Sequence, residues 1–245
     1  MRNNYTPEII TCHFTLCFIS KKINLNDKGY SLVFTNSIKQ EWKSIISVKK
    51  RRWLLLSGIL VLISSLFLNY FVSTWVDSVS KTAVGDLFLD LIPVFELNFL
   101  FFWAVFFFWI STIVFLLVNP KQLSFICWSL ALFVFIRCFF ISLTHLGPPE
   151  SAINIPESLS WFNFSADMFF SGHVGGPFLV ALIIERQPVK NLIIAYSICM
   201  VGIVLMAHGH YSIDVFASFF IAHSISVLVK KWEYVFYPPF KVNEE

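Results

Sequence analysis

The residues best suited to chemistry lie in two short polar stretches at the ends of apolar segments. One stretch, His208–Asp214, reads HGHYSID, and the other, Ser171–His173, reads SGH. Ionisable side chains at the edge of a lipid-buried segment are costly, and they are usually functional. The two stretches together therefore indicate an enzyme.

His210 and Asp214 form the first candidate catalytic pair. They are four residues apart, so on a helix they share one face. The carboxylate can then accept the ring N–H of the histidine, fix its tautomer and raise the basicity of the other nitrogen. This arrangement orients a histidine nucleophile or base. A polar pair that merely satisfies itself at a helix end is an equally good interpretation of these two residues alone.

Ser171, Gly172 and His173 form the second candidate element. Ser171 can cap a helix, and the free N–H groups of a helix start attract anions, so Ser171 and Gly172 are predicted to contact a substrate phosphate. His173 would then lie beside the phosphate and could protonate a leaving oxygen. An ordinary Ser-Gly helix start is the alternative, but both polar stretches are expected at the same membrane face.

Arg137 is the third candidate, because it lies inside an apolar segment where an unpaired guanidinium is expensive. It needs either an acidic partner or a bound anion, and a substrate phosphate is the preferred hypothesis. The candidate acidic partners are Asp86, Asp90, Asp167 and Asp214. Asp167 and Tyr211 are expected to support the catalytic residues from behind.

A metal site is disfavoured. His173, His210 and Asp214 could form a facial ligand set, but the chain has no His-x-x-x-His or Glu-x-x-His element. The five cysteines show neither metal-ligand spacing nor a disulfide framework.

The composition indicates an integral membrane protein. Hydrophobic residues make up 57% of the 245 residues, with 29 Phe, and 13% are charged, against about 25% in soluble domains. The net charge of +3 is too small to imply a nucleic-acid partner. The first long apolar run begins at Trp53, too deep for a signal peptide, and is expected to remain as a membrane anchor.

Six transmembrane helices are predicted, giving an all-α, polytopic fold. Each is near the roughly 20 residues that a helix needs to cross the hydrocarbon core. The predicted spans are Trp53–Val72, Val94–Val118, Leu123–Leu143, Met168–Ile184, Val189–Met206 and Tyr211–Val229.

The basic residues orient these spans. One side carries Lys49, Lys50, Arg51, Arg52, Lys121, Arg186, Lys190, Lys230, Lys231 and Lys241. The other carries Lys81 together with Asp77, Asp86, Asp90, Glu150 and Glu157. The positive-inside rule therefore places both termini in the cytoplasm and the catalytic residues at the non-cytoplasmic face.

Residues 1–50 are predicted to be a small cytoplasmic extension, followed by a membrane domain over 51–235 and a short tail over 236–245. Ile9–Ile19 and Tyr30–Phe34 are strand-like, with a turn at Asn26–Gly29. Ile38, Trp42, Ile45 and Ile46 then recur at helical spacing among lysines. They indicate either a basic amphipathic helix on the inner leaflet or a solvated linker.

Two segments carry a family resemblance. Asp167–His173 (DMFFSGH) and Ala207–Val215 (AHGHYSIDV) resemble the signature motifs of the sphingomyelin synthase family, within the type 2 phosphatidic acid phosphatase superfamily. Arg137–Pro148 and Asp86–Asp90 are similar to two further elements of that family. The resemblance covers about residues 84 to 232.

The resemblance implies a six-helix phosphatase-like bundle that moves a phosphate-containing head group without a metal or other cofactor. By analogy, His210 is the nucleophile, Asp214 orients it, and His173 protonates the departing alcohol and then activates the acceptor. The partners would be a phospholipid donor, a ceramide or diacylglycerol acceptor, and the bilayer. The alternatives are a lipid phosphatase or phospholipase C-like hydrolase that uses water, and a non-catalytic membrane protein or transporter.

Two departures from the superfamily pattern place the resemblance with the synthase branch and not with the phosphatase branch. Phosphatase members carry a Lys-x6-Arg-Pro motif and an arginine at the position of Val204, whereas this chain and the synthases lack both. Val174–Pro177 (VGGP) replaces a hydroxyl-rich run of the synthases, which leaves the head group and acceptor open. The short length favours a bacterial inner membrane, and the oligomeric state is open.

Overall fold

The computed structural model describes residues 27–80, 82–150, 152 and 167–232, and within this part the protein is all-helical, with no strand. This confirms the all-α prediction. The elements are α2 (Asp27–Ser47), α3 (Lys49–Val79), η1 (Leu89–Leu91), α4 (Asn98–Val118), η2 (Pro120–Gln122), α5 (Leu123–Leu143), α6 (Gly172–Ile183), α7 (Gln187–Met206) and α8 (Ser212–Lys230).

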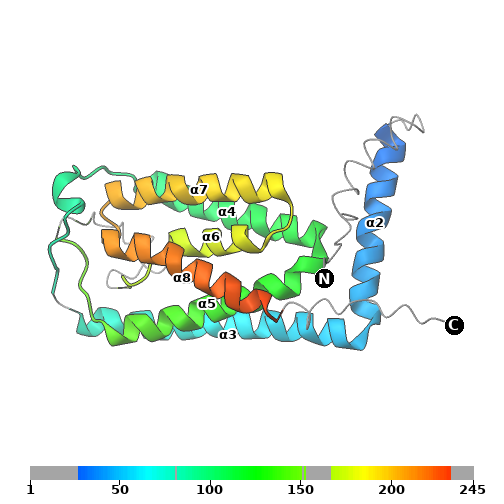
Figure 1. Ribbon diagram of the computed structural model, residues 1–245, viewed down its shortest axis with the longest axis horizontal. Helices are drawn as coiled ribbons and strands as arrows, with labels where there is room; N and C mark the ends of the chain where they lie inside the picture. Colours follow the sequence, from blue (N-terminus) through cyan, green and yellow to red (C-terminus); the bar gives the residue numbers. More distant parts are fainter. Residues whose placement is uncertain (1–26, 81, 151, 153–166, 233–245) are drawn as a thin grey trace, which may run out of the picture.

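In the part of the chain that the structure describes, five helices are long and apolar enough to cross a membrane, namely α3, α4, α5 together with η2, α7 and α8. They lie side by side in one bundle (Figure 1). Large apolar side chains point outward from it; Phe99, Leu192 and Phe220 are 78%, 71% and 75% exposed. A continuous apolar exterior of this kind suits lipid as the surrounding solvent.

The predicted fourth span, Met168–Ile184, contains a shorter helix than expected. Helix α6 has 12 residues, about 18 Å at 1.5 Å per residue, whereas the hydrocarbon core is about 30 Å thick. The prediction of six full spans is therefore not confirmed. The helix is shorter because the chain from Asp167 to Ser171 is non-helical, with two of its carbonyls engaged by a side chain of α5.

Helix α6 is the centre of the bundle, with α7 and α4 on one side and α8 and α5 on the other (Figure 1). Most of its residues are buried. At Gly175 an added Cβ would lie 2.9 Å from the Phe133 ring and 3.0 Å from the Ser218 Cβ atom. The glycine therefore allows α6 to pack closely between α5 and α8.

The N-terminal prediction was partly wrong. Tyr30–Phe34 and the expected turn at Asp27–Gly29 belong to α2 instead of a strand hairpin. Once the amphipathic segment around Trp42 forms a helix, each further residue that is fixed adds a hydrogen bond, whereas starting a helix fixes several residues for one bond, so the helix extends backward over the strand-like run. Ile9–Ile19 and the tail over 236–245 lie outside the described residues.

Helices α3 and α5 pack closely along their length, and Gly58 lies at a point of close contact between them. A Cβ at Gly58 would lie 2.9 Å from the Trp128 ring and 3.3 Å from the Ser124 carbonyl oxygen. The Trp128 indole N–H also donates to the Leu54 carbonyl at 3.3 Å. This contact fixes the first apolar helix against the rest of the bundle.

Replacing Gly58 by leucine should therefore destabilise the fold. Overpacking of this kind costs about 1–3 kcal/mol, measurable as a lower midpoint of thermal unfolding in detergent. Gly202→Leu is the matched control, because a Cβ at Gly202 meets no atom within 4 Å. Equal shifts for the two variants would contradict the predicted close contact.

Candidate active site

The first turns of α6 and α8 meet at one end of the bundle, which we call the outer end. The Ser171 backbone N–H donates to the Asp214 carbonyl at 3.1 Å. The imidazole rings of His173 and His210 consequently lie 5.8 Å apart, centroid to centroid. The structure thus brings together both histidine-containing stretches that the sequence singled out.

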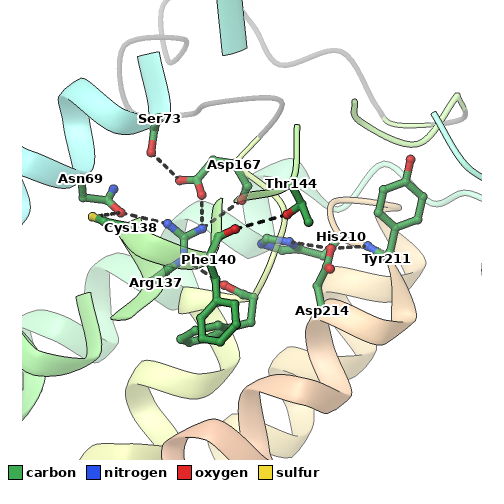
Figure 2. A network of polar contacts seen from close by, with 11 residues as sticks. Asn69, Ser73, Arg137, Cys138, Phe140, Thr144, Asp167, His210, Tyr211 and Asp214 are labelled. Carbon is green, nitrogen blue, oxygen red and sulfur yellow. Dashed lines mark hydrogen bonds and ion pairs between the residues drawn. The ribbon is translucent and has the colours of Figure 1, made fainter. Parts of the chain in front are cut away.

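His210 and Asp214 are buried as a pair, with the histidine 5% exposed and the aspartate 0%. The His210 Nδ1 atom lies 3.6 Å from the Asp214 Oδ2 atom, and Figure 2 shows the imidazole edge directed at the carboxylate. This is longer than a formed hydrogen bond, as is common in catalytic pairs without substrate. The orientation leaves Nε2 as the nitrogen available for chemistry.

The start of α8 positions Asp214. Tyr211 precedes the helix with extended backbone angles, and Asp214 is three residues into the cap sequence. Its Oδ2 atom accepts the Tyr211 backbone N–H at 3.1 Å. Such a reach back from the third position to the cap holds a carboxylate in one orientation. The same Oδ2 atom faces His210, so the carboxylate that caps the helix also orients the histidine.

His208 has a different environment from His210. Its backbone has a φ of 49°, in the left-handed region that few side chains adopt. Its Nε2 atom lies 3.0 Å from the Ile92 carbonyl oxygen, which requires Nε2 to carry the proton. His208 therefore helps to form the turn between α7 and α8 and is separate from the proposed catalytic set.

His173 lies on the first turn of α6, where its ring contacts the Phe101 ring edge-on at 4.7 Å between centroids. Four buried side-chain atoms at this junction have no hydrogen-bond partner within the described part of the chain: Ser171 Oγ, His173 Nδ1, His210 Nδ1 and Asp214 Oδ1. Buried polar atoms are normally satisfied. Their grouping between two helix starts fits a site that receives a polar ligand.

The N-terminus of α6 adds backbone donors to this site. The first helical hydrogen bond runs from the Gly175 N–H to the Ser171 carbonyl. The N–H groups of Gly172, His173 and Val174 precede it, so none of them donates within the helix. Such groups, with the positive end of the helix dipole, bind anions.

Arg137 is held by protein groups at the same end of the bundle. Its guanidinium forms an ion pair with the Asp167 carboxylate and donates to the Asp167 and Phe170 carbonyls and to the Asn69 side-chain oxygen, each bond 2.9–3.0 Å long (Figure 2). Among its candidate acidic partners, the structure selects Asp167. A direct contact between Arg137 and substrate phosphate stays a prediction.

The network reaches α3 through two residues that the sequence analysis missed. Asn69 accepts from Arg137 at 3.0 Å, and the Ser73 hydroxyl donates to the Asp167 carboxylate at 3.0 Å. Both are polar, they are four residues apart, and they lie in an apolar span. Polar residues so placed on one helix face are an available signal of a buried network. Phe101, which contacts the His173 ring, was also missed, because one more phenylalanine in an apolar helix gives no sign of a site.

Tyr211 joins the loops of the outer end. Its hydroxyl donates to the Gly147 carbonyl at 3.0 Å and accepts the Val84 N–H at 3.1 Å. The Gly147 N–H in turn donates to the Thr82 carbonyl at 2.9 Å. A Cβ at Gly147 would lie 3.0 Å from the Thr82 backbone, so this approach needs glycine. The loops after α3 and α5 are thereby fixed to the residue that follows His210.

Asp86 connects the α3–α4 loop to the start of α8. Its carboxylate accepts the Ser212 N–H at 2.7 Å, the Ser212 hydroxyl at 2.9 Å and the backbone N–H groups of Phe88 and Leu89. Burial raises the pKa of Asp86, but these hydrogen bonds outweigh it and hold the pKa below its ordinary value.

The Asp86 bonds should make stability depend on pH. Because the pKa is lower in the folded state, the stabilisation is present at neutral pH and is lost as the pH falls through the lowered value. Asp86→Asn should therefore cost about 1–2 kcal/mol at pH 7, and the difference from wild type should shrink below pH 4. Thermal unfolding across this pH range measures it.

Asp90→Asn is the control for this prediction, because Asp90 is exposed on the same loop. Its unfolding should match wild type at every pH. A deficit of Asp86→Asn that stays constant down to pH 3 would show that ionisation of Asp86 does not stabilise the fold.

The comparison with protein families gives one match. The PAP2 superfamily C-terminal domain matches residues 165–231, which contain α6, α7, α8 and the turn before them. No curated protein matches the chain. The match supports PAP2 superfamily membership. This superfamily generally comprises phosphatases and phosphotransferases that act on lipids, so the match also supports an enzyme of this general kind.

Proposed function

We propose that this protein transfers a phosphate-containing head group from a membrane phospholipid to ceramide or diacylglycerol, in the manner of a sphingomyelin synthase. The observation that carries the proposal is the junction of α6 and α8. There His210 faces Asp214 at 3.6 Å and His173 lies 5.8 Å away between ring centroids. The superfamily match covers this junction.

The first half-reaction forms a phosphohistidine. The His210 Nε2 atom attacks phosphorus, and the bond from phosphorus to the glycerol oxygen breaks. His173 gives its proton to that oxygen, which leaves as the diacylglycerol hydroxyl. Asp214 accepts the Nδ1–H of His210 and balances the positive charge that the ring gains.

The second half-reaction restores the enzyme. His173, now neutral, takes the proton of the acceptor hydroxyl, whose oxygen attacks phosphorus. The bond from phosphorus to His210 breaks, and the head group leaves on the acceptor. Positioning and charge stabilisation supply most of the catalysis in such phosphoryl transfers.

The phosphate oxygens need donors, and the start of α6 supplies them in this proposal. The candidates are the backbone N–H groups of Gly172, His173 and Val174 and the Ser171 hydroxyl. Arg137 holds the backbone that leads to these donors. Its guanidinium donates to the Phe170 carbonyl, and the N–H group of the next residue, Ser171, donates to the Asp214 carbonyl. The peptide that leads into α6 is thus held from both ends, and Arg137 acts as a positioning residue.

Removing His210 should abolish the reaction. His210→Ala deletes the nucleophile, so transfer of labelled head group from phosphatidylcholine or phosphatidylethanolamine should fall by at least about 10³-fold. The purified full chain in detergent is assayed by separation of the lipid products. His223→Asn is the matched control, since His223 lies on the same helix α8 with an exposed side chain. Activity of His210→Ala equal to that of the control would refute the histidine mechanism.

The acceptor requirement separates transfer from hydrolysis. His210 is 5% exposed and Asp214 is 0% exposed, so we expect bulk water to compete poorly with a lipid hydroxyl. Labelled product lipid should therefore form when ceramide or diacylglycerol is added, with little free head-group phosphate in its absence. Rapid release of phosphorylated head group or inorganic phosphate without acceptor would instead identify a phospholipase C-like hydrolase or a phosphatase.

A further inference from the structure

Helix α2 lies across the end of the bundle opposite the outer end, which we call the basic end because Lys121, Lys190 and Lys230 lie there (Figure 1). Two contacts hold it there: the Trp42 indole N–H donates to the Leu117 carbonyl at 3.0 Å, and Glu41 pairs with Lys121 at 3.0 Å. Ile45, one turn further along α2, is buried, with 5% exposure. Leu117 lies in the last turn of α4 and Lys121 lies in η2. Helix α2 therefore packs against the membrane domain, whereas a solvated linker would make no such contacts.

The charge of this segment is strongly positive. Residues 35–52 contain six Lys and Arg and one acidic residue, Glu41, whose carboxylate is already engaged by Lys121. The side chains of Lys39, Lys43, Lys49, Lys50 and Arg52 are exposed. The surface formed by these five side chains is called the basic surface below.

Exposed apolar side chains accompany the basic surface. Ile46, Val48 and Trp53 are 55%, 45% and 58% exposed. A soluble acidic partner could use the charges but would leave these groups in water. The membrane interface accommodates both, because apolar residues enter the acyl boundary while lysine stems extend to the head groups.

The length of α3 places this segment at head-group depth. Its 31 residues span about 46 Å, whereas the hydrocarbon core is about 30 Å thick. The first turns of α3, which carry Lys49, Lys50 and Arg52, therefore extend beyond the core. Trp53 follows at the position where aromatic side chains mark the interface.

From this placement we propose that the basic surface, on α2 and the start of α3, binds the head groups of anionic phospholipids in the adjacent leaflet. By the positive-inside rule this is the cytoplasmic leaflet. The inference is independent of the proposed function, because the basic surface lies at the other end of the bundle from His173 and His210.

The test uses the purified full chain in a non-ionic detergent. Native mass spectrometry measures its affinity for dioleoyl phosphatidylglycerol and for dioleoyl phosphatidylcholine, which share acyl chains and differ in charge. Phosphatidylglycerol should bind more tightly to wild type, and the preference should weaken as salt rises. Each lysine near a membrane surface contributes about five-fold, so Lys39→Gln with Lys43→Gln should weaken phosphatidylglycerol binding by about thirty-fold.

Two control variants keep the result interpretable. Lys230→Gln with Lys231→Gln removes two exposed cations at the same end of the bundle but outside the basic surface, and should weaken phosphatidylglycerol binding much less than the Lys39 and Lys43 pair. Lys39→Arg with Lys43→Arg keeps the charge and should bind like wild type. Three results would overturn the proposal. Wild type could bind the two lipids with equal affinity, the two Gln double variants could lose equal affinity, or polyglutamate at matched charge could displace phosphatidylglycerol.

Discussion

The buried Arg137–Asp167 ion pair is the interaction on which the outer end of the bundle depends. A guanidinium at this depth must be neutralised and fully engaged. Arg137 achieves this by taking a carboxylate and two backbone carbonyls from the segment before α6. Those carbonyls belong to the non-helical segment Asp167–Ser171, which Arg137 stabilises, and α6 begins at Gly172. The same constraint makes α6 short and places its free N–H groups beside His210.

The candidate site is consequently a junction of two helix starts, held in place by the loops around it. Asp86 binds the first turn of α8, and Tyr211 ties together the loops after α3 and α5. They fix the backbone on either side of His210 and Asp214, which is how a reactive pair is kept in one geometry.

The two ends of the bundle show opposite chemistry. The outer end holds the buried Arg137–Asp167 ion pair and leaves polar atoms of Ser171, His173, His210 and Asp214 without hydrogen-bond partners among the described residues. The basic end exposes its cations, with α2 laid across it and Trp42 fixed to α4. One end is thus suited to enclosing a substrate, and the other to contact with a charged membrane surface.

The helical class, the ends of most apolar helices and the choice of His173, His210 and Asp214 as candidate residues follow from the sequence alone, because lipid burial makes each polar residue conspicuous. It misassigned Tyr30–Phe34, whose local strand preference yields to helix propagation. Only the tertiary structure decided the partner of Arg137 and the short length of α6. Both depend on contacts between α3, α5 and the segment before α6, which are distant in sequence, so that no one of these segments identifies its partner in another.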